Sequence, residues 1–144
     1  MNFNDFKKDG NILVPGAPED LLAQCEQSSG IVFPEDYKSL LRFTDGCLLK
    51  NVTFVIFFSC GSGFHPKETL AFANSGLNDV GMYFIGRFAG DMFGYLKGGE
   101  DQKIYSFFEE TGEKTFEADN LDNFASKYLV PKTRKGLWSQ LFSS

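Results

Sequence analysis

The sequence predicts an α+β domain in which a central, mainly antiparallel sheet of about five to six strands is flanked by N-terminal and C-terminal helices. Three observations predict this class. Helical spacing of apolar residues is found near the two ends of the chain and in one short segment between them. Strand-like segments between residues 47 and 118 mostly follow one another instead of alternating with helices. Aromatic residues make up 16% of the 144 residues, with 17 phenylalanines, which suits a densely filled sheet face.

Two helices are expected before the first strand. The first runs from about Pro18 to Ser28 and is closed by Gly30. The second is predicted over the segment Phe33-Pro34-Glu35-Asp36-Tyr37-Lys38-Ser39-Leu40-Leu41-Arg42-Phe43-Thr44-Asp45-Gly46. In that segment proline suits the first helical position, the two acids after it suit the positive end of the helix dipole, and the glycine suits a left-handed stop. The first dozen residues of the chain are polar and are expected to pack loosely.

The predicted strands follow these helices. They are expected over residues 47–49, 52–58, 82–88, 91–97, 103–109 and 114–118. The second is β-branched and aromatic throughout, as expected of a strand that is covered on both faces. A short helix that begins at Pro66 and ends at Gly76 separates the second strand from the third. Gly94, inside a strand, indicates a bulge or a close backbone approach.

The last predicted helix begins at Asp119 or Asn120 and ends at Pro131. Its apolar stripe consists of Leu121, Phe124, Ala125, Tyr128 and Leu129. A final amphipathic segment carries Leu137, Trp138, Leu141 and Phe142. No repeat, low-complexity tract or linker is visible, so the sequence predicts a single domain over residues 1–144.

The composition limits the class of protein. The formal net charge is −5, and charged residues such as Lys7 and Lys8 interrupt any run that resembles a signal peptide. The longest apolar stretch, Val52 to Phe58, is far shorter than the roughly 20 residues that span a bilayer. The chain is therefore expected to be soluble and cytoplasmic, without a membrane partner.

The three cysteines are Cys25, Cys47 and Cys60, an odd number without CxxC spacing. A disulfide framework is not expected, and a reducing compartment fits this usage. Free cysteines are usually small, buried apolar residues, and we expect that role for all three.

The reactive side chains argue against catalysis. His65 is the single histidine, no Gly-x-Ser-x-Gly motif accompanies it, and Cys60 precedes it in a glycine-rich segment. The cysteines and the histidine lack the ligand-pair spacing of a zinc site, and no phosphate-binding glycine loop is present. We therefore expect no enzyme activity, no catalytic residue, no metal and no cofactor. The alternative is a hydrolase or ligand-binding enzyme that uses His65, which otherwise caps the helix at Pro66 or faces water.

The acidic residues are concentrated late in the chain. Residues 100–122 contain eight acids and two lysines, a net charge of −6. Such a surface repels nucleic acid and attracts basic partners, but taken alone the charge is better explained as ordinary solubilising charge on hairpin edges and a helix start. Asp91, which follows a glycine-bracketed turn, is either displayed at the sheet rim for a partner or bonded to its own turn.

Four segments resemble those of one known family. The segment 33–46 resembles an opening helix, and the next resembles a strand–turn–strand: Phe84-Ile85-Gly86-x-x-x-Gly90-Asp91-x-Phe93-Gly94-Tyr95. The third resembles a following strand, Lys103-Ile104-Tyr105-Ser106-Phe107, and the fourth a closing helix, Leu121-x-x-Phe124-x-x-x-Tyr128-Leu129. In this order, over roughly residues 18–130, they are similar to the SUKH superfamily of Smi/Knr-type proteins. Ala89 departs from the pattern, because the family often has a glycine there.

This resemblance implies an α+β domain without enzyme activity. Bacterial members resemble immunity proteins, which bind and neutralise a cognate toxin, often a nuclease, and fungal relatives belong to regulators of cell-wall assembly. The first hypothesis is therefore a monomeric immunity protein that occludes a basic toxin domain. A general interaction or scaffold domain is the alternative. The candidate partner-binding residues are Asp91, Glu100, Asp101, Glu109, Glu110 and Glu113.

Overall fold

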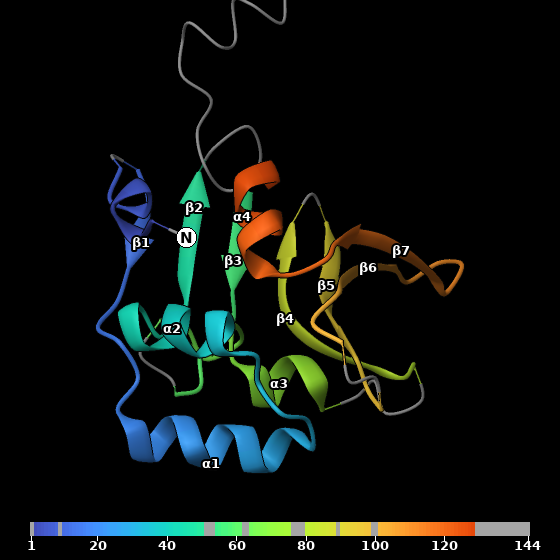
Figure 1. Ribbon diagram of the computed structural model, residues 1–144, viewed down its shortest axis with the longest axis horizontal. Coiled ribbons are helices and arrows are strands. Elements are labelled where there is room, and N and C mark those ends of the chain that lie inside the picture. The colour runs from blue at the N-terminus through green and yellow to red at the C-terminus, as the bar shows by residue number, and fades with distance from the viewer. Residues whose placement is uncertain are drawn as a thin grey trace, which may run out of the picture.

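The computed structural model describes residues 2–8, 10–50, 54–61, 64–75, 80–88, 90–98 and 101–128 (Figure 1). Its strands are β1 Ile12–Leu13, β2 Cys47–Lys50, β3 Phe54–Phe57, β4 Met82–Phe88, β5 Asp91–Leu96, β6 Ile104–Phe108 and β7 Glu113–Ala118. Its helices are the 3-10 helix η1 Phe3–Phe6 and the α-helices α1 Glu19–Ser29, α2 Glu35–Phe43, α3 Leu70–Asn74 and α4 Leu121–Tyr128.

The described residues form one seven-stranded sheet in the order β1 to β7, with every neighbouring pair antiparallel. The predicted α+β class is confirmed, and the strand count is slightly higher than expected. The difference is β1, whose two residues pair with β2 and are too few to give a period-2 pattern.

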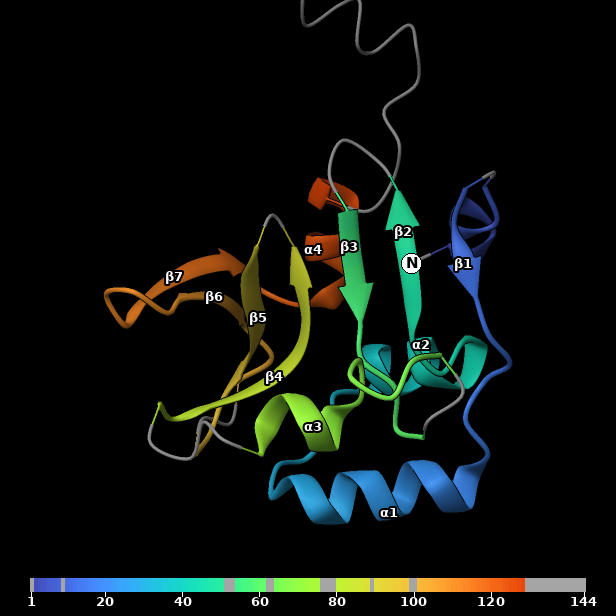
Figure 2. The same ribbon diagram turned by 180° about the vertical axis from the view of Figure 1, so that it is seen from behind.

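The helices cover the sheet unequally. α2 and α4 lie over one face in Figure 1, and α1 runs beyond α2 at one end of the sheet. Turning the molecule brings the strands in front of α2 and α4, with α3 beside the lower end of β4 (Figure 2). Within the described ranges, one face of the sheet is therefore packed against helices, and most of the other is not.

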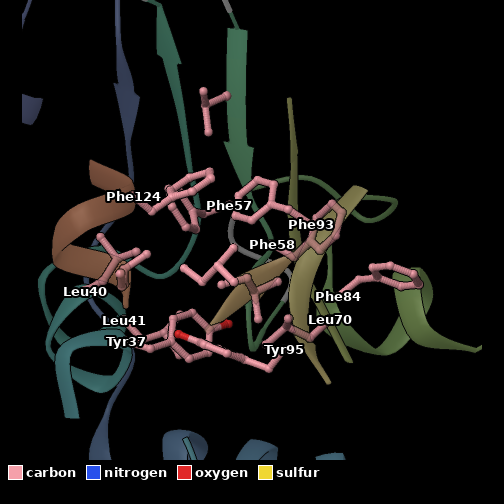
Figure 3. Packing of buried hydrophobic residues seen from close by; sticks show 14 of the residues in the cluster. Tyr37, Leu40, Leu41, Phe57, Phe58, Leu70, Phe84, Phe93, Tyr95 and Phe124 are labelled. Atoms are coloured by element: carbon pink, nitrogen blue, oxygen red, sulfur yellow. The ribbon is translucent and has the colours of Figure 1, made fainter. Parts of the chain in front are cut away.

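The core lies under α2 and α4. One row of cross-strand neighbours runs along this covered face: Leu13, Cys47, Phe57, Gly86, Phe93, Ser106 and Thr115. Phe93, at its centre, stacks on Phe124 of α4 with ring centroids 4.7 Å apart and meets Phe57 edge-on at 5.4 Å (Figure 3). A Cβ on Gly86 would lie 2.5 Å from the Phe93 ring, so the glycine makes room for that ring.

Gly94 lies beside a bulge and at a close backbone approach, as its position inside a strand predicts. The β4–β5 register shifts between Phe84 and Gly86, which marks a bulge, and Phe84 pairs with Gly94. A Cβ on Gly94 would lie 2.0 Å from the Tyr83 carbonyl oxygen, so the two backbones approach too closely for a side chain.

The segment 33–46 forms α2, with different ends from those expected. Pro34 takes the N-cap position instead of the first helical position. The helix ends at Phe43, because Thr44 is already extended with φ −148°. Gly46 does adopt a positive φ of 92°, but it does so beyond the helix, where a Cβ would lie 2.2 Å from Ser59 Oγ.

Two other expectations need correction, and a third is not tested. Loose packing of the first dozen residues is wrong, because Phe6 is fully buried and the Phe3 ring stacks on Phe43 at 4.7 Å. The short central helix begins at Leu70, since the Thr69 hydroxyl accepts a hydrogen bond from the Phe72 N–H, 3.1 Å away. The predicted end of α4 at Pro131 and the amphipathic segment beyond it lie outside the described residues.

The hydroxyl of Tyr37 provides a test of this core. Tyr37 is completely buried beside Tyr95, and within the described part of the chain neither hydroxyl has a hydrogen-bond partner. Burial raises the Tyr37 pKa well above its ordinary value. We expect Tyr37→Phe to leave stability unchanged or to raise it by up to about 1 kcal/mol, since it removes an unpaired polar atom. Urea unfolding measures this.

The control for Tyr37→Phe is Tyr37→Ala, which removes the whole ring and is expected to cost about 3–5 kcal/mol. A loss above about 1 kcal/mol in the phenylalanine variant would show that the hydroxyl is hydrogen-bonded in solution.

Candidate functional site

The uncovered side of the sheet carries a second row of cross-strand neighbours. We call this row the open face: Ile12, Leu48, Ile56, Arg87 and Met92, one residue from each of β1 to β5. Directly paired residues point to the same side of a sheet, so these five side chains form one band. Ile12 is 48% exposed, and its three apolar partners in the row are half-buried.

The open face corrects one prediction. The strand over 52–58 was expected to be covered on both faces, but Phe54 in β3 is 58% exposed and Ile56 is half-buried. Val55 and Phe57, which alternate with them, are buried in the core. The sequence of β3 is continuously apolar because apolar side chains point both into the core and out to the open face.

An ion pair divides the open face. Arg87 Nη2 on β4 donates to Glu68 Oε1 in the segment before α3. Glu68 lines a groove on each side of this pair. One groove, of about 540 Å³, is lined by Ile12, Val14, Ile56, Phe64, His65 and Glu68. The other, of about 530 Å³, is lined by Phe58, Lys67, Glu68, Phe72, Ala73, Ser75, Arg87, Gly90, Met92 and Glu109.

His65 lines the first of these grooves. A hydrolase or ligand-binding enzyme that uses His65 would bind its substrate there. The Nδ1 of His65 accepts a hydrogen bond from the Lys67 N–H, 3.1 Å away, so the ring caps its own turn. Among the described residues that line this groove there is no serine, threonine or cysteine, and its carboxylate, Glu68, is paired with Arg87. The described lining therefore gives the enzyme hypothesis no support.

Four of the six candidate partner-binding residues come together at one end of the sheet. Glu109, Glu110 and Glu113 lie at the turn between β6 and β7, all three exposed. The hairpin that carries them projects sideways from the body (Figures 1 and 2). Asp91 begins β5, and the pairing of Met92 with Phe107 brings it to the same end.

We call Phe108, Glu109, Glu110, Glu113 and Phe116 the acidic hairpin. Its aromatic members are 43% exposed at Phe108 and 50% exposed at Phe116. Phe108 is paired directly with Glu113, whereas Phe116 is paired with Tyr105 and points to the other side of the hairpin. The acids are therefore flanked by an exposed ring on each side of the hairpin. Glu109 also lines the second groove of the open face, which makes the two surfaces continuous.

The other two candidate residues are not part of this cluster. Asp101 is exposed and lies at the opposite end of β5, where it lines a separate cavity of about 450 Å³ with Tyr95 and Leu96. Glu100 lies outside the described residues. Asp101 and Glu109 are close in sequence, but Asp101 lies at the other end of the sheet from the acidic cluster.

One polar cluster escaped the sequence analysis. The buried Asp45, after α2, accepts hydrogen bonds from the backbone N–H groups of Cys60 (2.7 Å) and Gly61 (3.1 Å). Its neighbour Thr44 bonds both the N–H and the carbonyl oxygen of Val14 through its hydroxyl. Together they tie the end of α2 to the strand before it and to the loop after β3. The Thr-Asp-Gly sequence after a helix was the available signal, and it was interpreted only as a helix end.

Other kinds of site find little support in the described ranges. Within them, no three histidine, cysteine, aspartate or glutamate side chains lie where they could hold a metal ion together. The helices found there are all too short or too polar to cross a membrane.

Comparison with known proteins gives two findings. No curated protein matches the chain. The model of the SMI1 / KNR4 family (SUKH-1) matches residues 16–127, from the loop before α1 to the last turn of α4. The match includes both long N-terminal helices and every described strand except β1, which is well over half of the chain. The chain therefore belongs to the SMI1 / KNR4 family (SUKH-1).

Proposed function

We propose that this protein is a non-catalytic immunity protein that binds a cognate toxin domain and neutralises it by occlusion. Family membership carries the proposal, because a SUKH domain is consistent with an immunity-type or Smi/Knr-type role. The acidic hairpin, with Asp91 beside it, is the contact surface in this proposal, and the adjoining open face extends it.

The chemistry of the acidic hairpin supports a basic partner. Three exposed carboxylates in five positions create a negative potential that speeds encounter with a cationic surface. Exposed Phe108 and Phe116 supply the large apolar contacts that anchor interfaces. A nuclease domain fits this description, because its cleft binds phosphate and accepts carboxylates in place of it.

Capture of the partner is the first part of the test. The tagged chain is expressed in its native host and purified in low salt and in about 0.5 M salt, where the screening length falls below the roughly 8 Å of physiological buffer. We expect a stoichiometric basic protein with a toxin-like domain, retained more weakly in high salt. Recovery of a salt-insensitive housekeeping complex would favour a scaffold role instead.

Charge reversal is the second part. We expect the triple variant Glu109→Lys, Glu110→Lys, Glu113→Lys to weaken binding of the captured toxin domain about 100-fold, at about 1 kcal/mol for each contact. Titration calorimetry measures the affinity, and toxin activity in the presence of each variant measures neutralisation.

The matched control reverses Glu19, Asp20 and Glu35, three exposed acids on α1 and α2, and so changes the net charge equally. Circular dichroism confirms that both triple variants fold. Affinity of the hairpin variant equal to that of the parent would remove the acidic hairpin from the interface, whereas an equal loss in both triple variants would reduce its role to net charge.

A further inference from the structure

Two cysteines that are far apart in sequence meet beside α1. Cys25 lies in α1 and Cys60 follows β3, and both line one cavity of about 380 Å³ together with Leu21 and Tyr83. α1 lies close to the loop at this point, since a Cβ on Gly61 would be 3.3 Å from Leu21 Cδ2. Both thiols are half-buried, so small solutes can reach them. The expectation of three buried apolar cysteines is therefore wrong for this pair.

The third cysteine provides the contrast. Cys47 is completely buried in β2, paired with Phe57 in the core row. Burial raises the pKa of its thiol to about 12, so its reactive thiolate is scarce at neutral pH. Cys47 is thus chemically unreactive at neutral pH, whereas Cys25 and Cys60 share a cavity.

The two cavity thiols differ in acidity. A hydrogen bond from Cys60 lowers the pKa of Cys25, with a smaller contribution in the same direction from the Tyr83 hydroxyl, while burial acts against both. The same hydrogen bond raises the pKa of Cys60, because it holds the proton on that sulfur. Cys25 is therefore the better nucleophile, and Cys60 is a protonated thiol next to it.

We propose that Cys25 and Cys60 are an oxidation site at which peroxide forms a disulfide that joins α1 to the loop after β3. The Cys25 thiolate attacks one peroxide oxygen, the O–O bond breaks, and Cys25 becomes a sulfenic acid as hydroxide leaves. The Cys60 sulfur then attacks the Cys25 sulfur, an S–S bond replaces the S–O bond, and the Cys60 proton leaves with the hydroxyl as water. Two thiols and one hydrogen peroxide thus give one disulfide and two waters.

The test exposes the folded, reduced chain to a small excess of hydrogen peroxide and measures the mass of the intact monomer. We expect a loss of about 2 Da and a non-reduced peptide that links Cys25 to Cys60. The disulfide closes a long loop, so the oxidised monomer is expected to melt at least about 5 °C higher than the reduced one. A dithiol reductant should reverse both changes.

Three serine variants make the result specific. Cys47→Ser should form the disulfide as the parent does. Cys60→Ser should stop at a Cys25 sulfenic acid that dimedone labels, and Cys25→Ser should neither link nor take up the label at Cys60. Retention of the reduced mass by the folded parent, a bond to Cys47, or a bond only between molecules would overturn the proposal. The proposal does not depend on a toxin partner and needs none for its test.

Discussion

Replacing Phe93 with alanine is expected to lower the free energy of unfolding by about 3–5 kcal/mol. Phe93 is completely buried, and its ring contacts those of Phe57, Phe88 and Phe124 at centroid distances of 5.4, 5.6 and 4.7 Å. Phe57, Phe88 and Phe124 come from β3, β4 and α4, so the truncation leaves a cavity that touches three elements at once. Since small domains are stable by about 5–15 kcal/mol, this one change removes a large share of the total.

Urea unfolding followed by circular dichroism measures the loss at Phe93. The matched control is Phe116→Ala, because Phe116 is half-exposed on β7 and its truncation is expected to cost less than about 1 kcal/mol. Similar losses in the two variants would mean that α4 does not pack on the sheet as described.

The second large effect is expected at Asp45. Asp45→Ala should cost about 2–5 kcal/mol, because the Cys60 and Gly61 N–H groups lose their acceptors and each unsatisfied donor costs about 1–3 kcal/mol. Asp45→Asn keeps one acceptor oxygen and should lose about half as much. Amide hydrogen exchange provides a local readout, since protection at Cys60 and Gly61 should fall.

The control for Asp45 is Asp101→Ala. Asp101 is exposed, and its one hydrogen bond to the described residues is long, 3.3 Å from the Lys103 N–H, so its loss should change stability by less than about 0.5 kcal/mol. If Asp45→Ala unfolded at the same urea concentration as Asp101→Ala, the tie between α2 and the loop after β3 would have no energetic role.

The elements that could be predicted are those whose signal is local. α2 and α4 repeat apolar residues with helical spacing, and β4 to β7 follow one another with short turns, so pattern alone places them. β1 has two residues and depends on pairing with β2, which follows it by more than 30 positions. A strand of that length carries no periodicity.

In the candidate site, too, only the local grouping of residues could be predicted from the sequence. Glu109, Glu110 and Glu113 stay together because a tight turn joins them, whereas Asp91 and Asp101 are parted by the length of β5. The uncovered face of β3 could not be predicted, because an apolar residue such as Ile56 does not reveal whether a helix lies above it. Contacts such as that between Cys25 and Cys60 depend on how α1 docks, which no local pattern encodes.

The two edges of the sheet limit how a partner can bind. An exposed edge strand presents unpaired backbone groups on which a further strand can add. Here one edge is the two-residue β1, and the other is β7, which carries Glu113, Lys114 and Glu117 among its six residues. Short and charged edges oppose strand addition and edge-to-edge aggregation. We therefore propose that recognition of a partner uses side chains on the open face and the hairpin tip, which can change between related chains without disturbing the backbone pairing of the sheet.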